Sequence, residues 1–307
     1  MNRSLPALAL LFLALPALSL QAVAGTAPNP DAYRQEVEAF RKERVEDLKK
    51  EDGWFTLVGL FWLDEGENRF GSDPEGKVVL PEGKSPKVAG VLVRKGEKVA
   101  VRVEPGAKVT TGGEPLVPGT ARDLTSDAAG EPTVLEMGSV SFYVIQRGDK
   151  VGVRVKDKQS AALAAFHGLD TYPIQPAWRI EARFEPYDPP KTVKIPNILG
   201  QVSDSPAPGA IVFDWQGKTY RLDALGDPAQ GLSLIFADQT NGKETYGAGR
   251  FLETEPVKDG KVVVDFNLAY NPPCAFTSFA TCPLPPAQNR LALRVEAGEK
   301  RYAGSAH

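Results

Sequence analysis

The chain has 307 residues, of which 42% are hydrophobic, and this excludes wholesale disorder. Lysine and arginine number 36 against 39 aspartate and glutamate, so the formal net charge is −3, which argues against a nucleic-acid partner. The 29 glycines and 26 prolines are more than is usual and indicate many turns. Two cysteines are too few for a disulfide-dense scaffold.

Residues 1–24 have the pattern of a secretory signal peptide. Arg3 gives a positive start, the stretch 5–20 is apolar, and Ala22-Val23-Ala24 is an A-x-A cleavage sequence. The alternative, a transmembrane anchor, needs a longer apolar run, and no other segment is apolar enough to span a bilayer. We therefore expect an exported protein, periplasmic or extracellular, with no membrane span after cleavage.

Residues 25–53 are predicted to hold a short leader and one amphipathic helix. Asp31 is the expected N-cap, because its side chain can accept a hydrogen bond from a free backbone N–H. Gly53 is the expected end of the helix. Apolar side chains follow at helical spacing; they are Tyr33, Val37, Phe40, Val45 and Leu48.

Residues 54–157 are predicted to form a first β-rich subdomain. The aromatic run at 54–63 is short and interrupted by glycine, which favours a buried strand or tight turn. It carries Trp54, Phe55, Phe61 and Trp62, which fit core burial better than a sugar-stacking platform. Short strands then follow, separated by Gly and Pro turns. Gly148-Asp149 is a predicted hairpin turn.

Residues 158–177 form a predicted connection to a second β-rich subdomain at 178–303. Turns are expected at Gln216-Gly217 and Asn241-Gly242. Strands do not alternate with long helices, so a doubly wound parallel sheet is excluded. The predicted fold class is mainly β, with antiparallel sandwich-like or barrel-like sheets in one or two subdomains and one N-terminal helix. The predicted strands of the second half lie at 178–184, 191–195, 210–215, 218–222, 233–237, 247–253, 261–265 and 291–297.

Two long segments carry a family resemblance. The C-terminal half contains DQTNGKETYGAGRFL and then NPPCAFTSFATCPLPPAQNRL, and the N-terminal half contains GWFTLVGLFWLDEGENRFGSD. Together they resemble an uncharacterised bacterial and archaeal family, domain of unknown function 1684, across the mature chain. The resemblance implies that these segments form one unit, and it implies no activity. The strands of 78–116 also resemble the sandwich of forkhead-associated domains, as an analogy of fold alone.

Cys274 and Cys282 are the only cysteines and lie in a proline-rich loop. In an exported protein this pair predicts a disulfide. A thiolate nucleophile would need a nearby base, and a structural zinc site would need four ligands. No calcium loop and no glycine-rich phosphate loop is found, so no metal and no cofactor is predicted.

His167 is a weak catalytic candidate, because Asp170 lies close enough in sequence to orient its imidazole. A serine hydrolase would also need a G-x-S-x-G nucleophile elbow, which the chain lacks. The alternative is a loop histidine hydrogen-bonded to backbone.

A dense set of polar residues in the C-terminal half is the main candidate site. It would gather at one end of a sheet if the strands around Arg250 and Asp265 pair as a hairpin over 258–260. Such a cluster suits an unknown polar ligand, for example a glycan, although turn chemistry and a buried structural pair explain the same residue types. The candidate ligand-binding residues are Tyr246, Arg250, Asn267, Asn271 and Asn289.

Asp238 and Asp265 are weak catalytic candidates as paired carboxylates. A glycosidase needs them roughly 5–5.5 Å or 6.5–9.5 Å apart. Three functions follow from the sequence: a binding or accessory protein with a polar site, an envelope glycan or ester hydrolase using these two aspartates, or a purely structural envelope protein. The sequence leaves open whether the protein is an enzyme.

Overall fold

A computed structural model describes residues 29–304 of the chain. The predicted signal peptide and most of the leader lie outside these residues. The N-terminal helix is α1 (Pro30–Lys49), and its buried side chains include Tyr33, Val37 and Leu48. The N-cap is Asn29, whose side chain accepts a hydrogen bond from the Asp31 N–H at 3.0 Å, so the predicted cap at Asp31 is wrong by two residues. Pro30 fits the first position because its missing N–H would have no partner there.

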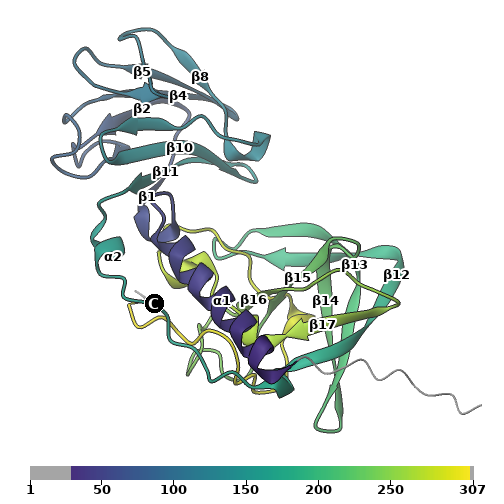
Figure 1. Cartoon of the computed structure of the whole chain (residues 1–307). Helices are drawn as coiled ribbons and strands as arrows, with labels where there is room; N and C mark the ends of the chain where they lie inside the picture. Colours follow the sequence, from purple (N-terminus) through teal and green to yellow (C-terminus); the bar gives the residue numbers. More distant parts are fainter. Residues whose placement is uncertain (1–28, 305–307) are drawn as a thin grey trace, which may run out of the picture.

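The first β unit consists of two facing sheets (Figure 1). One has the order β1-β11-β10-β9-β6-β7, and the other has the order β3-β2-β4-β5-β8. Pairing is antiparallel except between β2 and β3. The bounds are β1 (Leu57–Trp62), β2 (Gly66–Gly71), β3 (Val78–Val79), β4 (Gly90–Lys95), β5 (Lys98–Val103), β6 (Thr110–Thr111), β7 (Glu114–Pro115), β8 (Arg122–Leu124), β9 (Leu135–Met137), β10 (Val140–Arg147) and β11 (Lys150–Asp157). Short 3-10 turns lie at η1 (Trp54–Thr56) and η2 (Asp127–Ala129).

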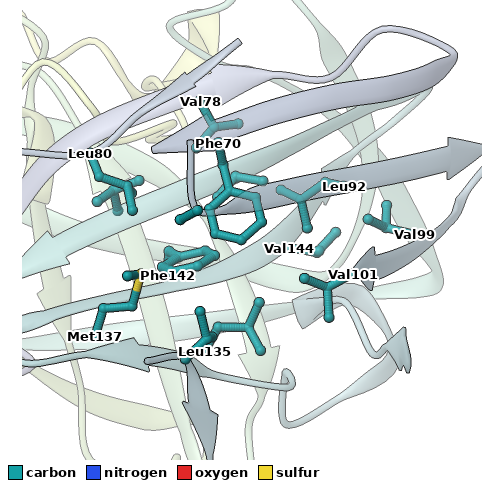
Figure 2. Close-up of a cluster of buried hydrophobic side chains, with 14 of the residues drawn as sticks. Phe70, Val78, Leu80, Leu92, Val99, Val101, Leu135, Met137, Phe142 and Val144 are labelled. Atoms are coloured by element: carbon teal, nitrogen blue, oxygen red, sulfur yellow. The ribbon is translucent and has the colours of Figure 1, made fainter. Parts of the chain in front are cut away.

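The space between these sheets is filled by apolar side chains from both (Figure 2). Phe70 of β2 and Phe142 of β10 meet with their ring centroids 5.3 Å apart. Alternate residues of β10 and β11 face this core, as expected for strands with a period of two. The hairpin turn at Gly148-Asp149 is confirmed, because Arg147 pairs with Lys150 across it.

The second β unit is a half-barrel of six strands in the order β16-β15-β14-β13-β12-β17. It follows α2 (Ala161–Ala164) and η3 (Pro176–Trp178). The predicted turn at Gln216-Gly217 is confirmed by the pairing of Trp215 with Lys218. The strand bounds are β12 (Arg179–Pro196), β13 (Val202–Trp215), β14 (Lys218–Asp227), β15 (Gly231–Phe236), β16 (Arg250–Glu253) and β17 (Lys261–Asp265), followed by η4 (Phe266–Leu268), η5 (Pro273–Ala275) and η6 (Ala287–Asn289).

Two predictions about this unit are wrong. β16 pairs with β15, and β17 pairs with β12, so the strands around Arg250 and Asp265 form no hairpin. Residues 291–297 form no strand; they run extended through the second core, where Val295 and Ala297 are fully buried. The carbonyls of Val295 and Ala297 accept hydrogen bonds from the Arg250 side chain, and the Leu293 carbonyl accepts one from the backbone N–H of Gln239.

The predicted fold class is confirmed: the chain is mainly β, with antiparallel sheets and an N-terminal helix. Helix α1 contacts η4 of the second unit and η1 at the start of the first (Figure 1). Neither α1 nor any shorter helix among residues 29–304 has the length and apolar character that a membrane span requires. The subdomain bounds and the likeness to a forkhead-associated sandwich stay predictions.

Candidate functional site

Arg250, the central residue of the predicted site, forms a buried ion pair with Asp238. Its Nη2 lies 2.7 Å from the Asp238 Oδ2, and both side chains are fully buried. The guanidinium also donates to the carbonyls of Val295, at 2.9 Å, and of Ala297. The pair therefore attaches the 291–297 segment to the half-barrel through Nη1 and Nη2 of Arg250, while the buried Nε has no hydrogen-bond partner.

Asp265 and Asn267 belong to a second buried network, with Tyr33 of α1. The Tyr33 hydroxyl donates to Asp265 Oδ2 at 2.8 Å and accepts from Asn267 Nδ2 at 2.8 Å. The Asn267 backbone N–H donates to Asp265 Oδ1 at 3.0 Å. The Nε of Arg179 lies 3.9 Å from Asp265 Oδ2. This network attaches α1 to the second unit. Asp238 and Asp265 thus have different cationic partners, and among residues 29–304 no hydrogen bond links their two networks.

The Asp265 network predicts an unusual pH dependence of stability. Burial raises the pKa of Asp265 above its ordinary value of 3.8, against the opposing hydrogen bonds from Tyr33 and Asn267. The folded protein then binds this proton more tightly than the unfolded chain, so this residue contributes stability that increases as the pH falls through the raised pKa and levels off below 3.8. The matched variant is Asp265→Asn, which keeps a hydrogen-bond acceptor for Tyr33 but cannot ionise. We expect urea unfolding to show that the free energy of unfolding of wild type rises relative to that of this variant as the pH falls across this range. A wild-type protein that loses stability relative to Asp265→Asn as the pH falls through this range would contradict the assignment.

Asn271, another candidate ligand-binding residue, lies beside a buried carboxylate. Its backbone N–H donates to Glu299 Oε2 at 2.8 Å, and its side-chain amide donates to the Lys300 carbonyl at 2.7 Å. Arg44 of α1 donates to both the Glu299 carboxylate and the Asn271 carbonyl. Asn271 therefore ties the helix to the C-terminal segment.

Asn289 and Tyr246 are also bonded within the protein. The Asn289 side chain accepts from the Asp223 N–H at 2.8 Å and donates to the carbonyls of Asp223 and Ile235. The Tyr246 hydroxyl donates to the Cys274 carbonyl at 3.1 Å, and burial raises its pKa to about 12. All five candidate ligand-binding side chains are buried. Asn267 also lines a small cavity of about 90 Å³ between α1 and the C-terminal segment, and a ligand role for these five residues stays a prediction.

The predicted disulfide is wrong, because Cys274 and Cys282 are both free thiols in the structure. The backbone N–H of each donates to the sulfur of the other at 3.2 Å. The contact between the two thiols lowers the pKa of Cys274 and raises that of Cys282. Because these contacts hold the loop closed, it needs no covalent bond for its shape.

His167 borders an open cavity of about 620 Å³ beside α2. The cavity has an aromatic floor that includes Phe55 and Phe276, and Asp170 lies on its rim. Within residues 29–304 the His167 imidazole has no hydrogen-bond partner, and no contact to Asp170 orients it. The structure thus places His167 on the surface, outside the hydrogen-bond networks of Asp238 and Asp265.

A second cavity, of about 480 Å³, lies at one end of the half-barrel, and we call it the mouth cavity. Trp178 of η3 and Trp215 at the end of β13 stack in its wall, with ring centroids 4.0 Å apart and an angle of 13°. Trp178 is buried, whereas Trp215 and the neighbouring Tyr220 are half-buried. The lining residues are Gln175, Trp178, Trp215, Gln216, Lys218, Tyr220, Gln239, Ala292, Leu293, Arg294 and Glu296.

Polar side chains without partners surround these rings. The amides of Gln175, Gln216 and Gln239 and the Lys218 amine line the mouth cavity, and within the described chain they make no side-chain hydrogen bond. Arg294 is instead paired with Glu296 and with Glu244. The sequence did not reveal this site, because the aromatic run that could form a stacking platform lies at 54–63. The signal in the sequence that points to this site is that two predicted strands each have a tryptophan at one end, Trp178 and Trp215.

Comparison with known proteins gives a family and no activity. A family model described as "Protein of unknown function (DUF1684)" matches residues 164–300. One similar solved structure is the solution NMR structure of the uncharacterized protein from gene locus rrnAC0354 of Haloarcula marismortui. It is 33% identical, and the match covers 45% of this chain and 78% of that chain with a TM-score of 0.38. No curated protein matches the chain.

Proposed function

This chain belongs to the DUF1684 family of unknown function, as its sequence resemblance predicts, and we propose that it is a carbohydrate-binding accessory protein whose ligand occupies the mouth cavity. The observation that carries the proposal is the combination of a stacked tryptophan pair with unpartnered amide side chains in one cavity. Ligand sites combine an apolar wall with a few convergent polar groups, and the mouth of a β-barrel is a common place for them.

The chemistry of the mouth cavity suits a sugar ring. The C–H faces of a pyranose are apolar and pack on an aromatic ring, as the half-buried Trp215 and Tyr220 allow. Its hydroxyls both donate and accept, and so do the side-chain amides of Gln216 and Gln239. A glutamine amide without a protein partner can replace its hydrogen bond to water by one to a ligand hydroxyl with little loss of free energy. This supports an uncharged, hydroxyl-rich ligand.

The charges of the cavity favour a neutral sugar over a strongly charged one. Arg294 is compensated by two carboxylates, and Lys218 is exposed at the turn between β13 and β14. No buried charge that lines this cavity is therefore unpaired. The predicted export of the protein agrees with a ligand among envelope or extracellular glycans.

Replacing Trp215 with alanine is expected to weaken binding of neutral oligosaccharides about tenfold or more, because large aromatic side chains are typical binding hot spots. Gln239→Ala is expected to have a smaller effect, since it removes hydrogen bonds alone. The measurement is a glycan-array screen, followed by calorimetric titration of the best neutral oligosaccharide.

Trp62→Ala is the matched control, because Trp62 is also a half-buried tryptophan but lies in β1, outside the mouth cavity. We expect it to bind like wild type. Equal loss in both variants, or no neutral glycan bound by folded wild type, would contradict the proposal. The second result would favour the purely structural role that the buried, hydrogen-bonded cluster around Arg250 supports.

A further inference from the structure

The two cysteines form a preorganised pair of sulfur atoms. Each sulfur accepts a backbone N–H from the other cysteine at 3.2 Å, so the two side chains face each other across the loop. Both residues are buried, within the cluster that contains Phe55, Phe166 and Phe276. The two sulfurs thus lie together in a buried site without being bonded.

A buried cation beside this pair lacks an anion. Arg154 of β11 is 4% exposed and forms no ion pair within residues 29–304. Its guanidinium donates to the Tyr143 hydroxyl at 3.3 Å and lies 5.5 Å from the centre of the Trp54 ring, while its Nε has no partner. Trp54 packs against the cluster that contains both cysteines, so the Arg154 guanidinium lies beside that cluster. A buried charge normally requires compensation, and the sulfurs are the groups that can supply it.

We propose that Cys274 and Cys282 form a two-coordinate site for a soft monovalent metal ion, Cu(I). Thiolates select Cu(I) among the common metals, whereas structural zinc requires four ligands. On binding, two S–H bonds break and two Cu–S bonds form, two protons leave to solvent, and the copper stays Cu(I). The bound unit of two thiolates and one Cu(I) carries a net charge of −1, which Arg154 neutralises.

The surroundings fit this role. The backbone N–H groups that bond the sulfurs stabilise negative charge on them, as second-shell donors do at metal sites. Tyr246 holds the Cys274 carbonyl, which fixes the loop from the other side. Phe276, two residues after Cys274, borders the 620 Å³ cavity, so solvent comes close to the loop.

The test is competition between the reduced full-length protein and a chromogenic Cu(I) chelator, without oxygen. We expect one Cu(I) per chain and two sulfur ligands by X-ray absorption. Cys274→Ser and Cys282→Ser are each expected to weaken binding by more than about 100-fold, and Arg154→Gln by roughly 10- to 100-fold. Arg154→Lys should restore much of the affinity, because it keeps the positive charge.

Ser278→Ala is the matched control, since Ser278 is exposed in the same loop and lies between the cysteines; it should bind like wild type. If the serine variants do not fold, the proposal is tested by comparing the Cu(I) affinity of Arg154→Gln with that of Arg154→Lys. The proposal is overturned if reduced wild type does not compete with the chelator, if Arg154→Gln binds as wild type does, if more than two sulfurs surround the copper, or if protein purified without reductant has both thiols joined as a disulfide.

Discussion

Replacing Arg250 with methionine is expected to lower the free energy of unfolding by about 3–5 kcal/mol, because it leaves the Asp238 carboxylate buried without its cation. The same change removes the donor to the carbonyls of Val295 and Ala297, which weakens the attachment of the 291–297 segment. Methionine keeps most of the volume of arginine, which limits the contribution of an empty cavity. Denaturant unfolding followed by circular dichroism measures the difference.

Two further variants distinguish the buried pair from a general loss of charge. Lys194→Met breaks the exposed ion pair of Lys194 with Asp204, whose atoms are 3.0 Å apart, and is expected to change stability by less than about 1 kcal/mol. Asp238→Asn in the Arg250→Met background should recover part of the loss, because it removes the unpaired charge. A loss below about 1 kcal/mol for Arg250→Met alone would show that the pair is not a structural element.

The local features of this fold were predictable from sequence. Gly148-Asp149 and Gln216-Gly217 both lie in two-residue hairpin turns. The positive φ that such turns need is adopted by Gly148 in the first turn and by both residues in the second, so the signal lies in the turn residues themselves. Alternating apolar residues likewise determined which strands face a core. These signals depend on neighbours in sequence, and they sufficed for the fold class.

Strand pairing over long distances was not predictable in the same way. β16 and β17 are separated by a short connection, yet they lie at opposite ends of the sheet order, so proximity in sequence gave the wrong neighbours. The segment 291–297 alternates like a strand, but two of its carbonyls, those of Val295 and Ala297, accept hydrogen bonds from Arg250. Apolar alternation reports burial, and it does not identify the group that satisfies the backbone.

The candidate site shows a similar limit. Arginine, aspartate and asparagine in the C-terminal half have the chemistry of a ligand site, but the same groups can satisfy buried backbone. Sequence gives their chemical type and not the direction in which they point. The mouth cavity combines residues from 175 to 296, and no local motif joins Trp178 to Gln239 or Arg294. Only the closing of the half-barrel brings them together.

Asn289→Ala is expected to cost about 3 kcal/mol in the free energy of unfolding, because it leaves three buried backbone groups without partners. These are the N–H and carbonyl of Asp223 and the carbonyl of Ile235. The adjacent Gln288→Ala is the control: Gln288 is exposed and bonds the Asp223 carboxylate alone, so its loss should cost less than about 1 kcal/mol. Equal stability of the two variants would mean that Asn289 is free to bind a ligand, whereas the expected difference assigns it to holding β14 and β15 against the C-terminal segment.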